Sequence, residues 1–111
     1  MATIISKDEL RNEILDITLI DVRNSNEYKH SHIQGAENIP MDELQVEAQK
    51  RYNPEKKLVI YGEDDKMGQK AANKLEEEGF KHITLYKDGF QDWIDSHYPT
   101  KKVDLGNKLR E

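Results

Sequence analysis

Short apolar runs alternate with segments of helical periodicity along most of this chain. Runs with the length and β-branched content of buried strands occupy residues 18–22, 36–39, 58–61 and 83–86. Apolar spacings of three and four predict helices over residues 7–15, 42–52, 68–78 and 90–96, and a turn leads into a further short helix at 24–28. Strands that alternate with helices are typical of a parallel sheet in an α/β fold.

Local signals mark the ends of these elements. Ser6 and Glu9 have the S-x-x-E spacing of a capping box at the start of the first helix. Gly79 stands where a glycine ends the third long helix. Phe90 and Trp93 share an apolar stripe and are expected in the core. Because apolar periodicity stops after Pro99, we expect one domain over residues 1–98 and a polar C-terminal tail over 99–111.

The composition excludes several classes of protein. The 111 residues include no cysteine, which removes disulfides, thiolate metal ligands, iron–sulfur clusters and thiol nucleophiles. The apolar runs are far shorter than the roughly 20 residues of a membrane-spanning helix, and the N-terminus has acids where a signal peptide has a basic head. The net charge is −5 and the basic residues are scattered. We therefore expect a cytoplasmic protein that binds neither nucleic acid nor membrane.

The segment Gly62–Met67 joins a predicted strand to a predicted helix. Ligands of parallel sheets bind at such connections, where backbone N–H groups and the helix dipole attract anions. Here Glu63, Asp64 and Asp65 stand against the single cation Lys66, so the segment has a formal charge of −2. These carboxylates compensate the dipole themselves and repel an anionic ligand.

Three motifs occur in order along the chain: Leu19-Ile-Asp-Val-Arg-Asn-Ser-Asn-Glu-Tyr28, Ser31-His-Ile-Gln-Gly-Ala-Glu-Asn-Ile-Pro40 and Lys87-Asp-Gly-Phe-Gln-Asp-Trp93. Together they resemble a single-domain rhodanese over about residues 3 to 98, although Asp88 replaces a glycine of the third motif. The resemblance implies an α/β fold with a central, mostly parallel sheet of about five strands and helices on both faces.

The resemblance also implies an active-site loop of the form C-x4-R. In active members the cysteine takes up sulfur as a persulfide, and the arginine helps to bind an anionic donor, commonly thiosulfate. This chain has Gly62 at the cysteine position and Met67 at the arginine position. We therefore predict a non-catalytic rhodanese-like domain that acts as a binding or regulatory module. Its degenerate loop comprises Gly62, Glu63, Asp64, Asp65, Lys66 and Met67.

The motifs also suggest residues of the scaffold and the pocket rim, namely Asp21, Arg23, Glu27, His32 and Gly35. We expect Asp21 and Arg23 to form a hydrogen-bonded charge pair at the end of a buried strand, with Arg23 reaching Glu27 if residues 23–27 are helical. His32 is expected to fix its loop through backbone hydrogen bonds. His30 and His32 would make only half of a metal site, so no metal and no cofactor are expected.

The acidic loop leaves two kinds of function open. A protein partner, if there is one, is expected to be basic where it meets residues 62–67. In the alternative, Asp64 or Asp65 acts as a nucleophile or general base, alone or with Mg²⁺, in hydrolysis or group transfer.

Overall fold

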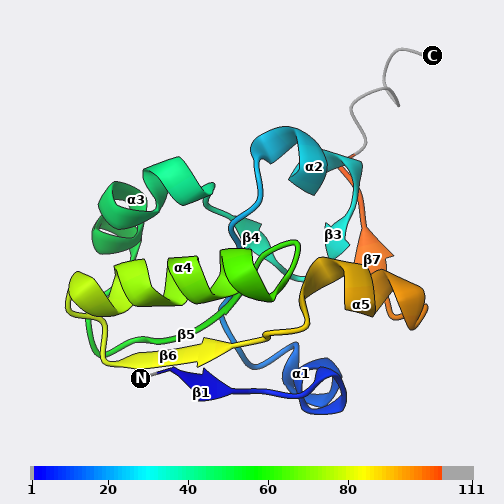
Figure 1. Ribbon diagram of the computed structural model, residues 1–111, viewed down its shortest axis with the longest axis horizontal. Coiled ribbons are helices and arrows are strands. Elements are labelled where there is room, and N and C mark those ends of the chain that lie inside the picture. Colours follow the sequence, from blue (N-terminus) through cyan, green and yellow to red (C-terminus); the bar gives the residue numbers. More distant parts are fainter. Residues whose placement is uncertain (1, 104–111) are drawn as a thin grey trace.

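The computed structural model describes residues 2–103 and shows a parallel sheet covered by helices (Figure 1). Its five strands lie in the order β1-β6-β5-β2-β4, and every neighbouring pair is parallel. The strands are β1 (Thr3–Ile4), β2 (Leu19–Asp21), β4 (Glu37–Asn38), β5 (Lys57–Tyr61) and β6 (His82–Leu85). The predicted α/β class with a parallel sheet of about five strands is confirmed.

Helices connect the strands on both sides of the sheet. They are α1 (Lys7–Glu13), α2 (Ser25–His30), the 3₁₀ helix η1 (Met41–Glu43), α3 (Leu44–Arg51), α4 (Asp65–Glu77) and α5 (Gly89–Asp95). Across residues 2–103, no helix is long and apolar enough to cross a membrane.

Alternate residues of the central strands enter two separate cores, as the two-residue period of a strand requires. Ile20 of β2 and Ile60 of β5 pack with buried residues of α3 and α4, such as Leu75. Leu19 and Tyr61 face the other way and pack with residues of α1 and α5. The helices therefore cover both faces of the sheet, as predicted.

The longest helix begins earlier than the apolar pattern predicts. The carboxylate of Asp64 accepts a hydrogen bond from the backbone N–H of Met67 at 3.0 Å and caps α4, which starts at Asp65 rather than at Gly68. The apolar stripe marks only the part of the helix that touches the core, whereas the cap determines where the helix begins. The connection from β5 to α4 is therefore only residues 62–64.

A small antiparallel sheet lies beside the main one. It pairs β3 (His32–Ile33) with β7 (Thr100–Lys101), two strands too short to show an apolar pattern. The carbonyl oxygen of Pro99 accepts hydrogen bonds from Trp93 Nε1 at 2.8 Å and from the Gln34 backbone N–H at 3.3 Å. The chain is thus held against the domain after Pro99. The rest of the expected tail, residues 104–111, lies outside the described residues.

Candidate functional site

The site lies where β2 and β5 end, below the connection from β5 to α4. Asp21 and Tyr61 are the last residues of these strands and are paired in register. The Tyr61 hydroxyl donates a hydrogen bond to Asp21 Oδ2 at 2.6 Å and accepts one from the Ile33 backbone N–H at 3.0 Å. Burial and the neighbouring charge of Asp21 raise the pKa of Tyr61 well above its ordinary value, so the hydroxyl remains a donor.

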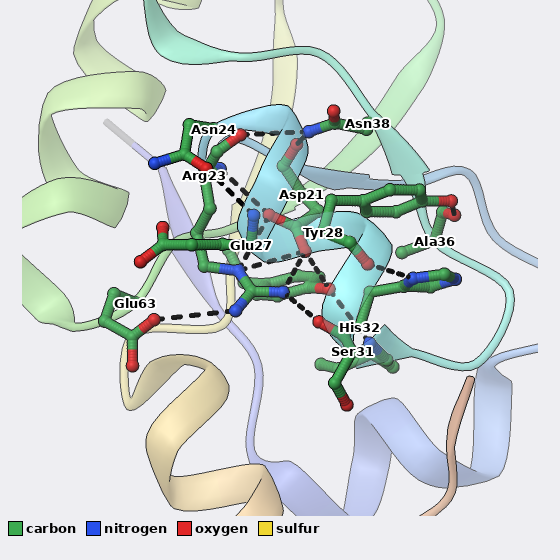
Figure 2. A network of polar contacts seen from close by, with 12 residues as sticks. Asp21, Arg23, Asn24, Glu27, Tyr28, Ser31, His32, Ala36, Asn38 and Glu63 are labelled. Atoms are coloured by element: carbon green, nitrogen blue, oxygen red, sulfur yellow. Dashed lines mark hydrogen bonds and ion pairs between the residues drawn. The ribbon is translucent and has the colours of Figure 1, made fainter. Parts of the chain in front are cut away.

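Asp21 and Arg23 form a buried charge pair (Figure 2). Asp21 is fully buried and Arg23 is 3% exposed. Arg23 Nη2 donates to Asp21 Oδ2 at 2.8 Å, and Arg23 Nε lies 3.1 Å and 3.2 Å from the two carboxylate oxygens. Burial by itself disfavours the charged guanidinium, but the hydrogen bond and charge of Asp21 outweigh it and raise the pKa of Arg23.

The rest of the guanidinium is also occupied. Nη2 donates to the Ser31 carbonyl oxygen at 2.5 Å, and Nη1 lies 3.5 Å from Glu63 Oε1. The guanidinium carbon stands 3.9 Å from the centroid of the Phe90 ring, the geometry of a cation–π contact. Besides Asp21, groups from three further segments therefore hold Arg23.

The expected pairing of Arg23 with Glu27 depended on a helix over residues 23–27. Instead, α2 begins at Ser25, and its cap is Asn24, whose side chain accepts a hydrogen bond from the Glu27 backbone N–H at 2.8 Å. Arg23 therefore precedes the helix and pairs with Asp21 and Glu63. The contact between Arg23 and Glu63 could not be predicted from local sequence spacing, because the two residues are far apart in the chain.

The three loop acids have different surroundings. The carboxylate of Glu63 pairs with Arg23, and that of Asp64 caps α4. Asp65 lies exposed in the first turn of the helix, where a negative charge interacts favourably with the helix dipole. Structural roles thus account for two of the three side chains and leave Asp65 exposed to solvent.

The first residues of α5 pack closely against the connection between β5 and α4. Gly89 has φ +80°, and a Cβ there would lie 2.6 Å from the Glu63 carbonyl oxygen and 2.9 Å from Asp64 Cα. The Phe90 backbone N–H donates to the Gly62 carbonyl oxygen at 2.9 Å. Only a residue without a side chain permits this approach, so α5 fixes the position of the connection.

Met67 lies against Gly62. A Cβ built on Gly62 would come within 2.7 Å of Met67 Cγ and 2.9 Å of Met67 Cβ and Sδ. The Met67 side chain is partly buried and packs on the core beneath α4. The space that a side chain at position 62 would enter is therefore filled.

A pocket of about 430 Å³ opens between α2, residue 63 and α5. Phe90 and Ile94 contribute apolar surface to it, and Glu27 and Glu63 contribute carboxylates, together with Arg23 and His30. Within residues 2–103, no group of three or more His, Asp or Glu side chains is arranged to hold a metal ion.

His32 and Gly35 contact Tyr28 and Ile14, respectively. His32 is buried, with Nδ1 2.8 Å from the Tyr28 carbonyl oxygen and its ring stacked on that of Tyr28 at 3.7 Å. Gly35 adopts φ +95° beside Ile14 of the α1 end. These contacts place the two motif residues next to α2 and the end of α1.

Sequence reasoning missed Tyr61 and Asn38. Asn38 Nδ2 donates to the carbonyl oxygens of Asp21 and Arg23, both at 3.0 Å. Each residue ends a strand next to β2, so the parallel order of the strands would have placed both beside Asp21.

Comparison with known proteins decides the family. The family model described as rhodanese-like domain matches residues 6–96. The chain belongs to the rhodanese-like family. Thiosulfate sulfurtransferase GlpE from Coxiella burnetii is 34% identical over 89 residues, covering 80% of this chain and 81% of the relative. The rhodanese-like domain of the Anabaena protein Alr3790 superposes with a TM-score of 0.85 at 25% identity, covering 95% of this chain and 83% of that chain.

This rhodanese-like domain therefore lacks the active-site cysteine of its family, because its sequence contains none. Another relative, the uncharacterized protein YqhL of Bacillus subtilis, is 32% identical over 89 residues, covering 80% of this chain and 70% of the relative.

Proposed function

We propose that this rhodanese-like domain is a non-catalytic, cytoplasmic binding module without sulfurtransferase activity. The observation that carries the proposal is the contact between Gly62 and Met67: no thiol is present, and the space for one is filled. The relative from Coxiella burnetii is named a thiosulfate sulfurtransferase. In our proposal, this chain has kept that fold without that chemistry.

The charges near the loop support the same proposal. A sulfur-accepting thiolate needs an electropositive surrounding that lowers its pKa and attracts an anionic donor. Lys66 within the loop is outnumbered by three carboxylates, and the neighbouring cation Arg23 is already paired with Asp21 and lies beside Glu63. Little positive charge is left for an anionic donor.

We further propose that the ligand of this module is a basic segment of a partner protein. Glu27 and Glu63 line the pocket beside the loop, and Phe90 and Ile94 supply apolar surface. A Lys or Arg side chain has an apolar stem and a charged end, which matches this combination. Asp65 at the start of α4 extends the acidic surface.

Binding of a short Lys- and Arg-rich peptide, measured by fluorescence anisotropy, tests the partner proposal. The variant Glu63→Gln/Asp64→Asn/Asp65→Asn should weaken binding roughly tenfold, because each exposed charge contributes up to about 1 kcal/mol. Asparagine caps a helix about as well as aspartate, so α4 should persist. The control Glu13→Gln/Asp16→Asn/Glu77→Gln removes the same charge at exposed residues that do not line the pocket and should bind like the parent. Equal binding by all three proteins would refute the proposal.

A further inference from the structure

A second pocket of about 480 Å³ lies between the end of α1, the turn at Gly35 and β7. It shares no lining residue with the pocket beside the loop. Ile14, Leu15 and Pro99 give it a largely apolar surface, and the fully buried Trp93 lies behind them. It goes beyond the proposed function, because no residue of the degenerate loop takes part.

One wall of this pocket carries an unusually exposed apolar side chain. Leu15, just after α1, is 93% exposed, more than any other large hydrophobic residue in the described part of the chain. Gly35 stands opposite, and a Cβ there would lie 3.8 Å from Ile14 Cγ1. Any side chain at position 35 would therefore project toward this apolar surface and narrow the pocket.

The charged side chains that line this pocket are all positive. Arg11 and Lys101 line it, and no carboxylate does, although the chain as a whole has a net charge of −5. Neither cation forms an ion pair within residues 2–103. The Arg11 guanidinium lies 4.6 Å from the centroid of the Tyr98 ring, a contact that leaves its hydrogen-bond donors available.

We propose that this pocket binds an acidic segment of a partner protein that carries a large apolar side chain. The apolar side chain packs against Leu15, Ile14 and Pro99, and flanking carboxylates pair with Arg11 and Lys101. Two cations on a negatively charged domain are too few for a nucleic-acid backbone, whose binding depends on many clustered phosphate contacts. Charge complementarity therefore favours an acidic protein segment.

A synthetic peptide with a central Leu-Phe pair flanked by Glu and Asp is the probe. Binding is followed by the fluorescence anisotropy of a labelled peptide, because Trp93, the only tryptophan of the chain, is fully buried. The affinity should fall as salt rises from roughly 0.05 M to about 0.5 M. Analogues with Gln and Asn for the acids, or Ser-Ser for Leu-Phe, should bind about tenfold more weakly or not at all.

Variants of the protein locate the binding. Leu15→Ser and Arg11→Gln/Lys101→Gln should each weaken peptide binding about tenfold. The controls Val46→Ser, at a residue 61% exposed on α3, and Lys56→Gln/Lys57→Gln should bind like the parent. Because Leu15 is almost fully exposed, its replacement should leave the fold intact, which circular dichroism verifies. Absence of peptide binding, equal binding of the neutral analogue, or tighter binding of an oligonucleotide or anionic vesicles would overturn the proposal.

Discussion

The side chain of Met67 fills the space that a side chain on Gly62 would enter, with Met67 Cγ 2.7 Å from the position of the missing Cβ. The two positions at which this chain departs from the C-x4-R pattern are therefore in physical contact. A thiol at position 62 and the methionine at position 67 compete for one volume. Restoring the cysteine alone should not restore a working site.

We expect Gly62→Ala to destabilise the domain by about 1–2 kcal/mol, the cost of overpacking at a well-filled position. In a Met67→Ala background the Cγ and Sδ atoms are gone and only Cβ, at 2.9 Å, remains close, so the same substitution should cost less. Urea unfolding of the parent, both single variants and the double variant gives the coupling energy between the two positions. Strictly additive effects would show that Met67 does not fill the space.

Replacing Asp21 should cost far more than breaking an exposed ion pair. Asp21→Asn leaves the guanidinium of Arg23 buried without its counter-charge, and we expect a loss of about 3–5 kcal/mol. Glu37→Gln weakens the exposed pair with Arg51, whose side chains are 48% and 40% exposed, and should cost less than about 1 kcal/mol. Denaturant unfolding ranks the two variants, and equal losses would contradict a structural role for the Asp21–Arg23 pair.

Gly89 and Gly79 both have positive φ, but only Gly89 packs against the connection between β5 and α4. Comparing alanine substitutions at the two positions tests the contribution of that contact to stability. Gly89→Ala places a methyl group 2.6 Å from the Glu63 carbonyl oxygen at φ +80°, so we expect a loss of more than about 2 kcal/mol. Gly79 has φ +98° and nothing within 4 Å, so Gly79→Ala should cost only about 1 kcal/mol of backbone strain. Thermal unfolding compares them, and a larger loss for Gly79→Ala would contradict the contact.

Stability should fall in alkaline solution. Burial and Asp21 raise the pKa of Tyr61 in the folded state, and burial and Glu37 raise the pKa of Tyr52 to about 12. The folded protein therefore holds protons that the unfolded chain has released, and the free energy of unfolding decreases as pH rises above about 10. Urea unfolding at increasing pH should show a shallower decrease for Tyr61→Phe than for the parent. Identical slopes would contradict the shifted pKa of Tyr61.

The centre of the parallel sheet and the longest helix could be predicted, because β5 contains an apolar run over Leu58–Tyr61 and α4 buries a periodic stripe. The edge strand β1 was missed, because Thr3–Ile4 is two exposed residues long. The short strands β3 and β7 could not be predicted, since two residues show no period. The early start of α4 was also missed, although Asp64 has the side chain of a good cap.

The site was predictable only where neighbours in sequence are neighbours in space. Asp21 and Arg23 pair across two residues, and the motif pointed to them. The contacts of Arg23 with Glu63 and Phe90 join distant segments, so they depend on how α5 packs beside the loop. The contact between Gly62 and Met67 likewise appears only once α4 is known to begin at Asp65.

The most direct test of the account is thiosulfate-to-cyanide sulfur transfer by the parent, Gly62→Cys and Gly62→Cys/Met67→Arg, with persulfide detected by intact mass. We expect no turnover by the parent, because it lacks a thiol, and none or very little by Gly62→Cys, because Met67 fills the site. The double variant replaces the thioether of Met67 with a guanidinium, which supplies the cation that lowers the pKa of a thiol and attracts an anionic donor, so it should form the persulfide more readily than Gly62→Cys. Reproducible turnover by the parent above a heat-inactivated control would contradict the central claim that this domain is non-catalytic.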